Sequence, residues 1–274
     1  MATLPIALQL YSVRDALEQD FVGTLEKVKA FGYDGVEFAG LYGHSAEEVR
    51  AMCEKIGLVP ISAHVPFADM VEDPAGVLGE YKKLCPYVVV PYMPEEKRPG
   101  TDGFAQTLKE IELVGKMAKK LGMVLLYHNH DFEFVKVDGK YGLDILYDTI
   151  PADLLQTELD TCWINVGGED PVAYIRKYTG RAPIVHLKDF VGGKSEGAAL
   201  YELIGIDSDA KKAAAEAFSF RPIGQGVQNF PEILKATKDA GASWVVVEQD
   251  RPAPGGESME SAKQSIDYLR SFDW

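Results

Sequence analysis

The sequence contains few cysteines, and no two of them lie at a metal-binding or redox spacing. Only Cys53, Cys85 and Cys162 occur in 274 residues, and none belongs to a C-x-x-C motif. This spacing argues against a cysteine-rich zinc site and against a disulfide framework, and it is typical of proteins kept in a reducing compartment. We therefore expect a cytoplasmic protein.

The sequence also lacks a long hydrophobic run and an excess of positive charge. No apolar stretch approaches the roughly 20 residues of a membrane span, and Met1 to Pro5 offers no basic region ahead of a hydrophobic segment. The net charge of −14 would repel a polyphosphate backbone. We expect neither a membrane nor a nucleic acid as a partner.

What the sequence does contain is a repeated order of helix, glycine and short strand. A glycine suited to a left-handed helix cap precedes a β-branched segment five times, at Gly32, Gly57, Gly122, Gly180 and Gly241. The predicted strands are short and almost wholly apolar, as parallel strands covered on both faces are. The eight predicted strands are Ile6–Leu10, Gly35–Phe38, Val59–His64, Tyr87–Val90, Val124–His128, Leu155–Leu159, Ile184–Leu187 and Trp244–Glu248.

This alternation predicts an α/β fold, a single (β/α)8 TIM barrel that occupies residues 1–274 as one domain. A doubly wound open sheet is the alternative. However, the first turn from strand to helix, Tyr11 to Asp15, lacks the glycine fingerprint of a dinucleotide site. The barrel is therefore the favoured architecture.

Local signals support helix starts between the strands and one long insertion. Ser45 and Glu48 form a capping box, and Asp170-Pro171 places a cap residue before a proline at the first helical position. The connection from Phe190 to Gly226, after strand seven, exceeds a typical loop. We expect it to be an insertion over the barrel mouth that contacts substrate or acts as a lid.

Ionisable side chains gather where the apolar strands end. Four of the five histidines close or follow strands three, five and seven, and carboxylates close strands two, six and eight. The C-terminal ends of barrel strands meet at one mouth, where barrel enzymes keep their chemistry. Because scatter alone would rarely produce this arrangement, we interpret the set as functional. Its members are Glu37, His64, His128, Asn129, His130, Glu158, Asp160, His186, Lys188, Asp189, Glu248 and Asp250.

Part of this set has the composition of a metal site. Imidazoles with carboxylates are typical ligands of zinc, manganese or cobalt. Asp160, His186 and Glu248 come from three consecutive strands and can close on one ion. The fourth ligand would be His128 or Glu158, which shares an inward face with Asp160, and the sequence leaves both open. We expect a divalent ion (Mn, Zn, Co or Mg) as cofactor.

Five segments carry a resemblance to a known family. They are Leu8–Asp15, Tyr127–Phe134, Leu159–Trp163, Val185–Asp189 and Val247–Asp250. Over essentially its full length the chain resembles the sugar phosphate isomerase/epimerase family, whose xylose isomerase-like TIM barrel places it in the AP endonuclease 2 superfamily. The resemblance implies a metal bound by an Asp on strand six, a His on strand seven and a Glu on strand eight. Asp160, His186 and Glu248 match these positions.

Two positions depart from that family's pattern. Family epimerases carry a Glu on strand five as ligand and base, whereas His128 stands here, which leaves the second base open. They also commonly have D-x-x-H on strand six, whereas this chain has Asp160-Thr161-Cys162-Trp163. Trp163 is expected either to stack on a sugar ring or to fill the barrel rim. The richer His/Asp cluster and the basic DNA face of the endonuclease branch are not evident in the sequence.

The predicted chemistry is proton abstraction next to a carbonyl through an enediolate, as in a metal-dependent sugar isomerase or epimerase. Glu248 is the leading base, and Glu158 or His128 would act on the opposite face. Lys188 or His130 would polarise or orient oxygens. The residues expected to contact substrate are Gln9, Tyr11, Glu37, His64, Asn129, His130 and Trp163.

Other functions remain open at this level. The same enediolate can expel a β-hydroxyl, so a dehydratase acting on an inosose or other keto-sugar, or a related lyase, is the nearest alternative. A non-catalytic sugar-binding barrel is an alternative of another class. The expected partner is a small sugar or polyol, and the acidic balance favours an unphosphorylated one. The sequence leaves the oligomeric state open, with a homodimer as one candidate.

Overall fold

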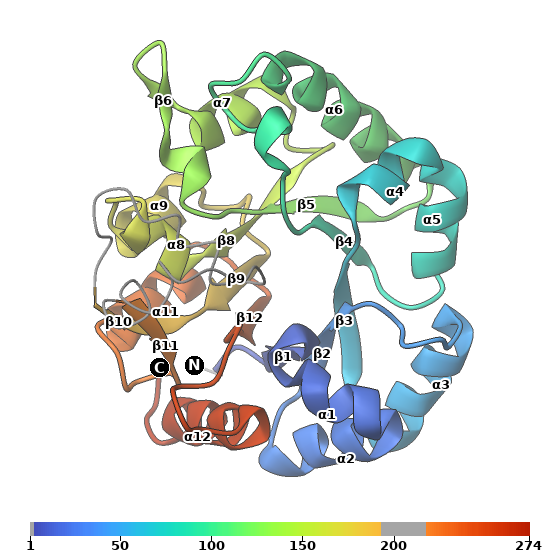
Figure 1. Cartoon of the computed structure of the whole chain (residues 1–274), viewed down its shortest axis with the longest axis vertical. Helices are drawn as coiled ribbons and strands as arrows, with labels where there is room; N and C mark the ends of the chain where they lie inside the picture. The colour runs from blue at the N-terminus through green and yellow to red at the C-terminus, as the bar shows by residue number, and fades with distance from the viewer. Residues whose placement is uncertain (1–2, 193–217) are drawn as a thin grey trace.

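The computed structural model describes residues 3–192 and 218–274. Eight parallel strands close into a barrel with helices around it, which confirms the predicted (β/α)8 architecture (Figure 1). The order around the barrel is β1-β12-β9-β8-β5-β4-β3-β2, so the first strand pairs with the last. The barrel strands are β1 (Ile6–Gln9), β2 (Gly35–Ala39), β3 (Val59–His64), β4 (Tyr87–Val90), β5 (Val124–His128), β8 (Gln156–Asp160), β9 (Ile184–Leu187) and β12 (Trp244–Val247).

Helices connect these strands and cover the outside of the barrel (Figure 1). They are α1 (Arg14–Gln19), α2 (Phe21–Phe31), α3 (Ala46–Ile56), α4 (Phe67–Glu72), α5 (Pro74–Tyr81), α6 (Phe104–Lys120), α7 (Gly142–Thr149), α8 (Thr161–Val166), α9 (Pro171–Lys177), α11 (Phe230–Asp239) and α12 (Ser258–Arg270). The 3-10 helices η1 (Leu10–Val13), η2 (Glu95–Lys97) and η3 (Phe132–Phe134) are single short turns. Within residues 3–192 and 218–274, no helix is both long and apolar enough to cross a membrane.

The predicted helix boundaries are present. Ser45 and Glu48 form the capping box at the start of α3, and the Asp170 side chain accepts the Val172 N–H at 3.0 Å at the start of α9. Gly32 and Gly57 follow α2 and α3 with φ of 105° and 85°, a backbone region that other residues enter at a cost. These turns send the chain from each helix back into the next strand.

The interior of the barrel is divided into two layers along its axis. The layer near the N-terminal ends of the strands is apolar and buried. Such a packed interior stabilises a TIM barrel. Its fully buried members are Ala7, Ile61, Val89, Leu126, Ile184 and Val246. The layer toward the C-terminal ends of the strands contains polar residues that the sequence analysis singled out. These side chains therefore lie at the end of the barrel where they were expected.

After β9 the chain leaves the barrel into an antiparallel pair, β10 (Asp189–Gly192) and β11 (Phe218–Arg221). The rest of the predicted insertion, residues 193–217, lies outside the described residues. Asp189 joins the chain before this segment to the chain after it, because its carboxylate accepts hydrogen bonds from four backbone N–H groups at 2.8–3.2 Å. The donors are Phe190, Gly224, Gly226 and Gln228. A second antiparallel pair, β6 (Lys136–Val137) and β7 (Lys140–Tyr141), lies after β5.

Candidate metal and sugar site

Four of the predicted site residues bring their ligand atoms together at the C-terminal end of the barrel. One ligand atom from each of His128, Asp160, His186 and Glu248 lies within 4.8 Å of the others. His186 Nδ1 is 3.0 Å from Glu248 Oε2, and His128 Nε2 is 3.8 Å from Asp160 Oδ2. They come from β5, β8, β9 and the end of β12, all of which adjoin in the barrel.

A second group of possible ligands overlaps the first. It consists of His64, His128, Glu158 and His186, again with ligand atoms within 4.8 Å of one another. Glu158 Oε2 lies 2.8 Å from His64 Nε2 and 3.2 Å from both His128 Nδ1 and His186 Nε2. Of the two candidates for the fourth ligand, His128 is therefore grouped with Asp160, His186 and Glu248, whereas Glu158 lies on the other side of His186.

Several buried polar atoms of this cluster lack a hydrogen bond. Asp160 Oδ2, Glu158 Oε1 and His186 Nε2 make none of good geometry within the part of the chain that the structure describes, although Lys188 Nζ lies 3.3 Å from Asp160 Oδ2 and Glu37 Oε1 lies 2.8 Å from His186 Nε2. A buried acceptor without a partner costs free energy. A divalent ion of the kind that prefers imidazole and carboxylate ligands would satisfy them.

The histidine at the strand-five position is suited to act as a neutral ligand or base. Burial first, and then the neighbouring imidazoles and Lys188, hold the pKa of His128 well below its usual range. The pKa of His130 is also lowered well below its usual range, mainly by burial and by Lys188. A neutral imidazole has a free lone pair for a metal or a proton.

Lys188 places its ammonium group among carboxylates rather than in solvent. Its Nζ lies 2.9 Å from Glu248 Oε2, 3.1 Å from Asp250 Oδ2 and 3.3 Å from Asp160 Oδ2. Burial alone would lower the pKa of Lys188, but these three carboxylates outweigh it and raise the pKa well above its usual value. The residue is therefore charged, and it partly neutralises an acidic cluster.

Glu37 lies deeper than the sequence suggested. It is fully buried, accepts hydrogen bonds from Gln9 Nε2 at 2.7 Å and Ser62 Oγ at 2.5 Å, and lies 2.8 Å from His186 Nε2. Burial would raise the pKa of Glu37, but the imidazoles of His64 and His186 hold it well below its usual range. Glu37 and Gln9 thus support the histidines from below and do not line the cavity described next.

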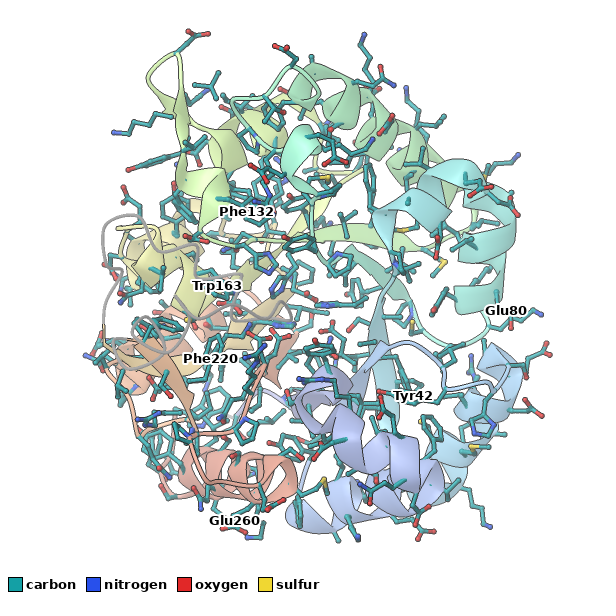
Figure 2. All side chains as sticks on the ribbon, viewed as in Figure 1. Tyr42, Glu80, Phe132, Trp163, Phe220 and Glu260 are labelled. Atoms are coloured by element: carbon teal, nitrogen blue, oxygen red, sulfur yellow. The ribbon has the colours of Figure 1, made fainter. Side chains whose placement is uncertain are left out.

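Two further residues that were predicted to contact substrate, Asn129 and Trp163, contact other groups of the protein instead. Asn129 exchanges hydrogen bonds with the backbone of Asp160, accepting its N–H at 3.0 Å. Trp163 is fully buried, with ring centroids 5.4 Å from His130 and 5.9 Å from Phe220, and Lys188 Nζ lies 5.3 Å from its centroid. Figure 2 shows Trp163 and Phe220 together on one side of the barrel. This placement favours the rim-filling alternative for Trp163.

A cavity of about 590 Å³ opens over the cluster. Of the predicted residues, the cavity is lined by Tyr11, His64, His128, His130, Lys188, Glu248 and Asp250. Sequence reasoning missed Tyr81, Pro66, Pro91 and Tyr92, which also line it. A signal was available for two of them, because Pro91-Tyr92 directly follows strand β4 and therefore belongs to the same mouth.

Comparisons with known proteins agree with this architecture. A family model described as a xylose isomerase-like TIM barrel matches residues 25–272. A solved sugar phosphate isomerase/epimerase from Parabacteroides distasonis has a TM-score of 0.78 and 23% identity, covering 99% of this chain and 95% of that one. The IOLI protein, solved with a bound zinc atom, has a TM-score of 0.71 and 16% identity, covering 99% and 100%. At these identities the two structures support the fold alone.

Two curated relatives are named inosose dehydratases. An inosose dehydratase from Clostridium perfringens is 28% identical over 167 residues, which is 60% of this chain and 54% of that protein. An inosose dehydratase from Lacticaseibacillus casei is 24% identical over 160 residues, or 58% and 51%. The chain spans about half the length of the curated relatives it matches.

Proposed function

Because the chain belongs to the xylose isomerase-like TIM barrel family, we propose that it is a metal-dependent isomerase or epimerase of a small sugar or keto-sugar. The observation that carries the proposal is the quartet His128, Asp160, His186 and Glu248, whose ligand atoms converge beside a cavity that His128 and Glu248 line. We infer that this quartet holds a divalent ion. Such an ion would polarise the substrate carbonyl and the neighbouring hydroxyl.

Glu248 is the residue proposed to remove the proton next to the carbonyl. It lines the cavity, and although burial would raise the pKa of its carboxyl, Lys188 and His186 hold that pKa well below its usual range. The carboxylate is therefore ionised in this structure. Lys188, 2.9 Å away, keeps it in place and can donate a hydrogen bond to a substrate oxygen.

A second group is needed on the opposite face if the proton is to return there. His128 lines the cavity and is neutral, so it is one candidate. Glu158 is the other, and since it does not line the cavity it would act through His64, whose Nε2 is 2.8 Å from Glu158 Oε2. His130 and Tyr11 line the same cavity and would orient the sugar.

The test is exchange of the carbon-bound proton of a ketose with deuterated solvent. Glu248→Gln nearly preserves shape but removes the charge, and we expect exchange at saturating metal to fall by at least about 10²-fold, the usual worth of a general base. Substrate binding should change less, since a base acts chiefly in the transition state. Glu54→Gln, an exposed carboxylate on α3, is the matched control and should exchange like the wild type.

Two results would count against this proposal in different ways. Exchange at the wild-type rate in Glu248→Gln would place the base elsewhere and direct attention to His128 and Glu158. No exchange by the wild type with any ketose of a broad panel, although metal is bound, would remove the isomerase and epimerase assignment altogether.

A dehydratase is the second candidate, and the specific observation in its favour is that the matched curated relatives are named inosose dehydratases. Removal of the same proton by Glu248 can be followed by loss of a β-hydroxyl as water instead of return of the proton. Mass spectrometry of the product distinguishes the two outcomes, because only the dehydratase releases a product lighter by one water.

A further inference from the structure

A second cavity lies beside the first, and the two share a wall. Pro66, Pro91 and Tyr92 line both the cavity of about 590 Å³ over the cluster and a neighbouring cavity of about 560 Å³. These residues follow β3 and β4 directly. From this wall the second cavity extends along α4, where Phe67 and Val71 line it. The candidate site therefore has a second cavity directly beside it, which we call the α4 groove.

The lining of the first cavity changes character around the barrel. Its charged and imidazole side chains, apart from His64, come from β5, β9 and β12 or from the residues after them, and these strands form one arc of the barrel in which β8 lies between β5 and β9. The opposite arc, from β1 through β2 and β3 to β4, contributes aromatic rings, prolines and small residues. These are Tyr11, Ala39, Gly40, Pro66, Pro91 and Tyr92. A ligand that fills the cavity thus needs a polar part on one side and an apolar part on the side that opens into the α4 groove.

The α4 groove offers little to a charged group. Its charged lining residues are Glu72 and Lys97, and Lys97 Nζ is held 2.6 Å from Glu110 Oε2. A phosphate at this end of a substrate would find Glu72 and no uncommitted cation among the described lining residues. An uncharged apolar group would instead remove apolar surface of Phe67, Val71 and Pro94 from water.

Tyr92, at the junction, is fixed in place before any ligand arrives. It is 41% exposed, and its ring meets His130 edge-on at 5.3 Å. The Arg98 guanidinium lies 5.2 Å from the ring centroid and donates a hydrogen bond to the Tyr92 hydroxyl. Its neighbours in the wall are prolines, which have no side-chain freedom to lose. Such a wall binds a flat apolar group at a low entropic cost.

We propose that the substrate is a keto-sugar bearing an aromatic substituent, an aryl glycoside with a ketone on its sugar ring, with the sugar over the histidine and carboxylate cluster and the aromatic ring passing Tyr92 into the α4 groove. This inference rests on the proposed function for the placement of the sugar. It adds what the cluster alone does not specify, the chemical class of the group attached to that sugar. A free monosaccharide would leave the apolar arc and the groove in water.

The experiment compares matched phenyl and methyl glycosides of glucose, galactose and xylose, which lack the ketone and so serve as non-reacting probes of binding to the metal-loaded protein, followed by calorimetry. For at least one sugar we expect the phenyl glycoside to bind about tenfold tighter or more, because it buries an aromatic ring. In protein with labelled alanine methyls, the phenyl glycoside should shift the signal of Ala68, which lines the groove, and the methyl glycoside should not.

A pair of matched variants locates the effect. Ala68 and Ala75 are exposed alanines at the second position of α4 and α5, and only Ala68 lines a cavity of the site. Ala68→Glu places a carboxylate in the groove and should reduce the phenyl-to-methyl affinity ratio to about one. Ala75→Glu makes the same change outside the groove and should leave the ratio at its wild-type value.

The outcomes separate this inference from the function on which it rests. Phenyl glycosides that bind no tighter than methyl glycosides, that do not bind at all, or that leave the Ala68 signal unmoved would overturn the aryl glycoside, even if the protein exchanges deuterium into a ketose. A large ratio that Ala68→Glu abolishes, in a protein that catalyses no exchange, would support the aryl subsite and reject the isomerase.

Discussion

The two layers of the barrel interior come from the same strands, yet they have opposite chemistry. On four strands an apolar residue of the lower layer stands two positions before a polar residue of the upper one. The pairs are Ala7 and Gln9, Leu126 and His128, Ile184 and His186, and Val246 and Glu248. Because side chains two apart share a face of a strand, each pair points inward. Two residues along a strand thus separate the layer that stabilises the barrel from the layer to which we assign the chemistry.

The energetic consequences of burial differ accordingly. In the lower layer, removal of apolar surface from water favours folding. In the upper layer, burial raises the pKa of Asp160 to about 6 and opposes the ionisation of Glu37, so the charges are kept only by partners such as His186 and Lys188. Substitutions in the lower layer should therefore change mainly the free energy of unfolding, and substitutions in the upper layer mainly the metal content.

The largest effect is expected from His186→Ala, which breaks the upper layer at one of the two residues common to both ligand groups. Elemental analysis should find about one divalent ion per wild-type chain and close to none in the variant. His44→Ala, outside both groups, is the control. Wild-type metal content in His186→Ala would exclude the proposed ligand set.

Leu126→Ala tests the lower layer, two residues before His128. We expect it to lower the free energy of unfolding by about 2–5 kcal/mol, measured by denaturant titration, because it leaves a cavity in a fully packed layer. The metal content below the unfolding transition should stay at the wild-type value. Leu113→Ala, at an exposed position on α6, should change stability far less. Loss of metal in Leu126→Ala would mean that the two layers are not separable.

A smaller effect concerns pH and a carboxyl beside the cluster. Burial raises the pKa of Glu133 to about 8, although Tyr127 and the His130 N–H donate hydrogen bonds to it. A raised folded pKa means that the unfolded chain ionises first, so the stability contribution present below about pH 4.5 is lost as pH rises through 8. Relative to Glu133→Gln, the wild type should lose stability over that window, on the order of a few kcal/mol. Parallel pH dependence in both proteins would contradict this.

The smallest effect is expected from Ser62→Ala, which removes one of the hydrogen bonds to Glu37. Gln9 and the two neighbouring imidazoles remain, so the free energy of unfolding should fall by only about 1–2 kcal/mol. Metal content should not change, since Ser62 belongs to neither ligand group. A loss of metal comparable with that of His186→Ala would show that Glu37 and its donors help to hold the ion.

Sequence alone predicted the fold well because the barrel strands are short apolar runs. All eight strands were placed within one residue of their bounds. The largest difference is at β8, which runs from Gln156 to Asp160 instead of from Leu155 to Leu159. The sequence also indicated that the ionisable residues would gather at the C-terminal end of the barrel, because parallel strands bring their C-terminal ends together. Depth was not predictable: Glu37 reads as a rim residue in the sequence, but it lies beneath His64 and His186.

The groove beside the site was not predictable from sequence for another reason. Tyr92 and Phe67 lie on separate connections after β4 and β3, and no periodicity tells how two irregular segments approach each other. Trp163 shows the same limit. Its large surface was compatible with a sugar contact, and only the packing around it, against His130 and Phe220, favours a structural role.

The clamp formed by Asp189 joins parts of the chain that lie far apart in the sequence. Four N–H groups from both sides of the segment between β9 and α11 converge on one carboxylate, and β10 pairs with β11. One side chain therefore fixes both the point at which the chain leaves the barrel after β9 and the point at which it returns before α11. Replacement of Asp189 would release both points at once.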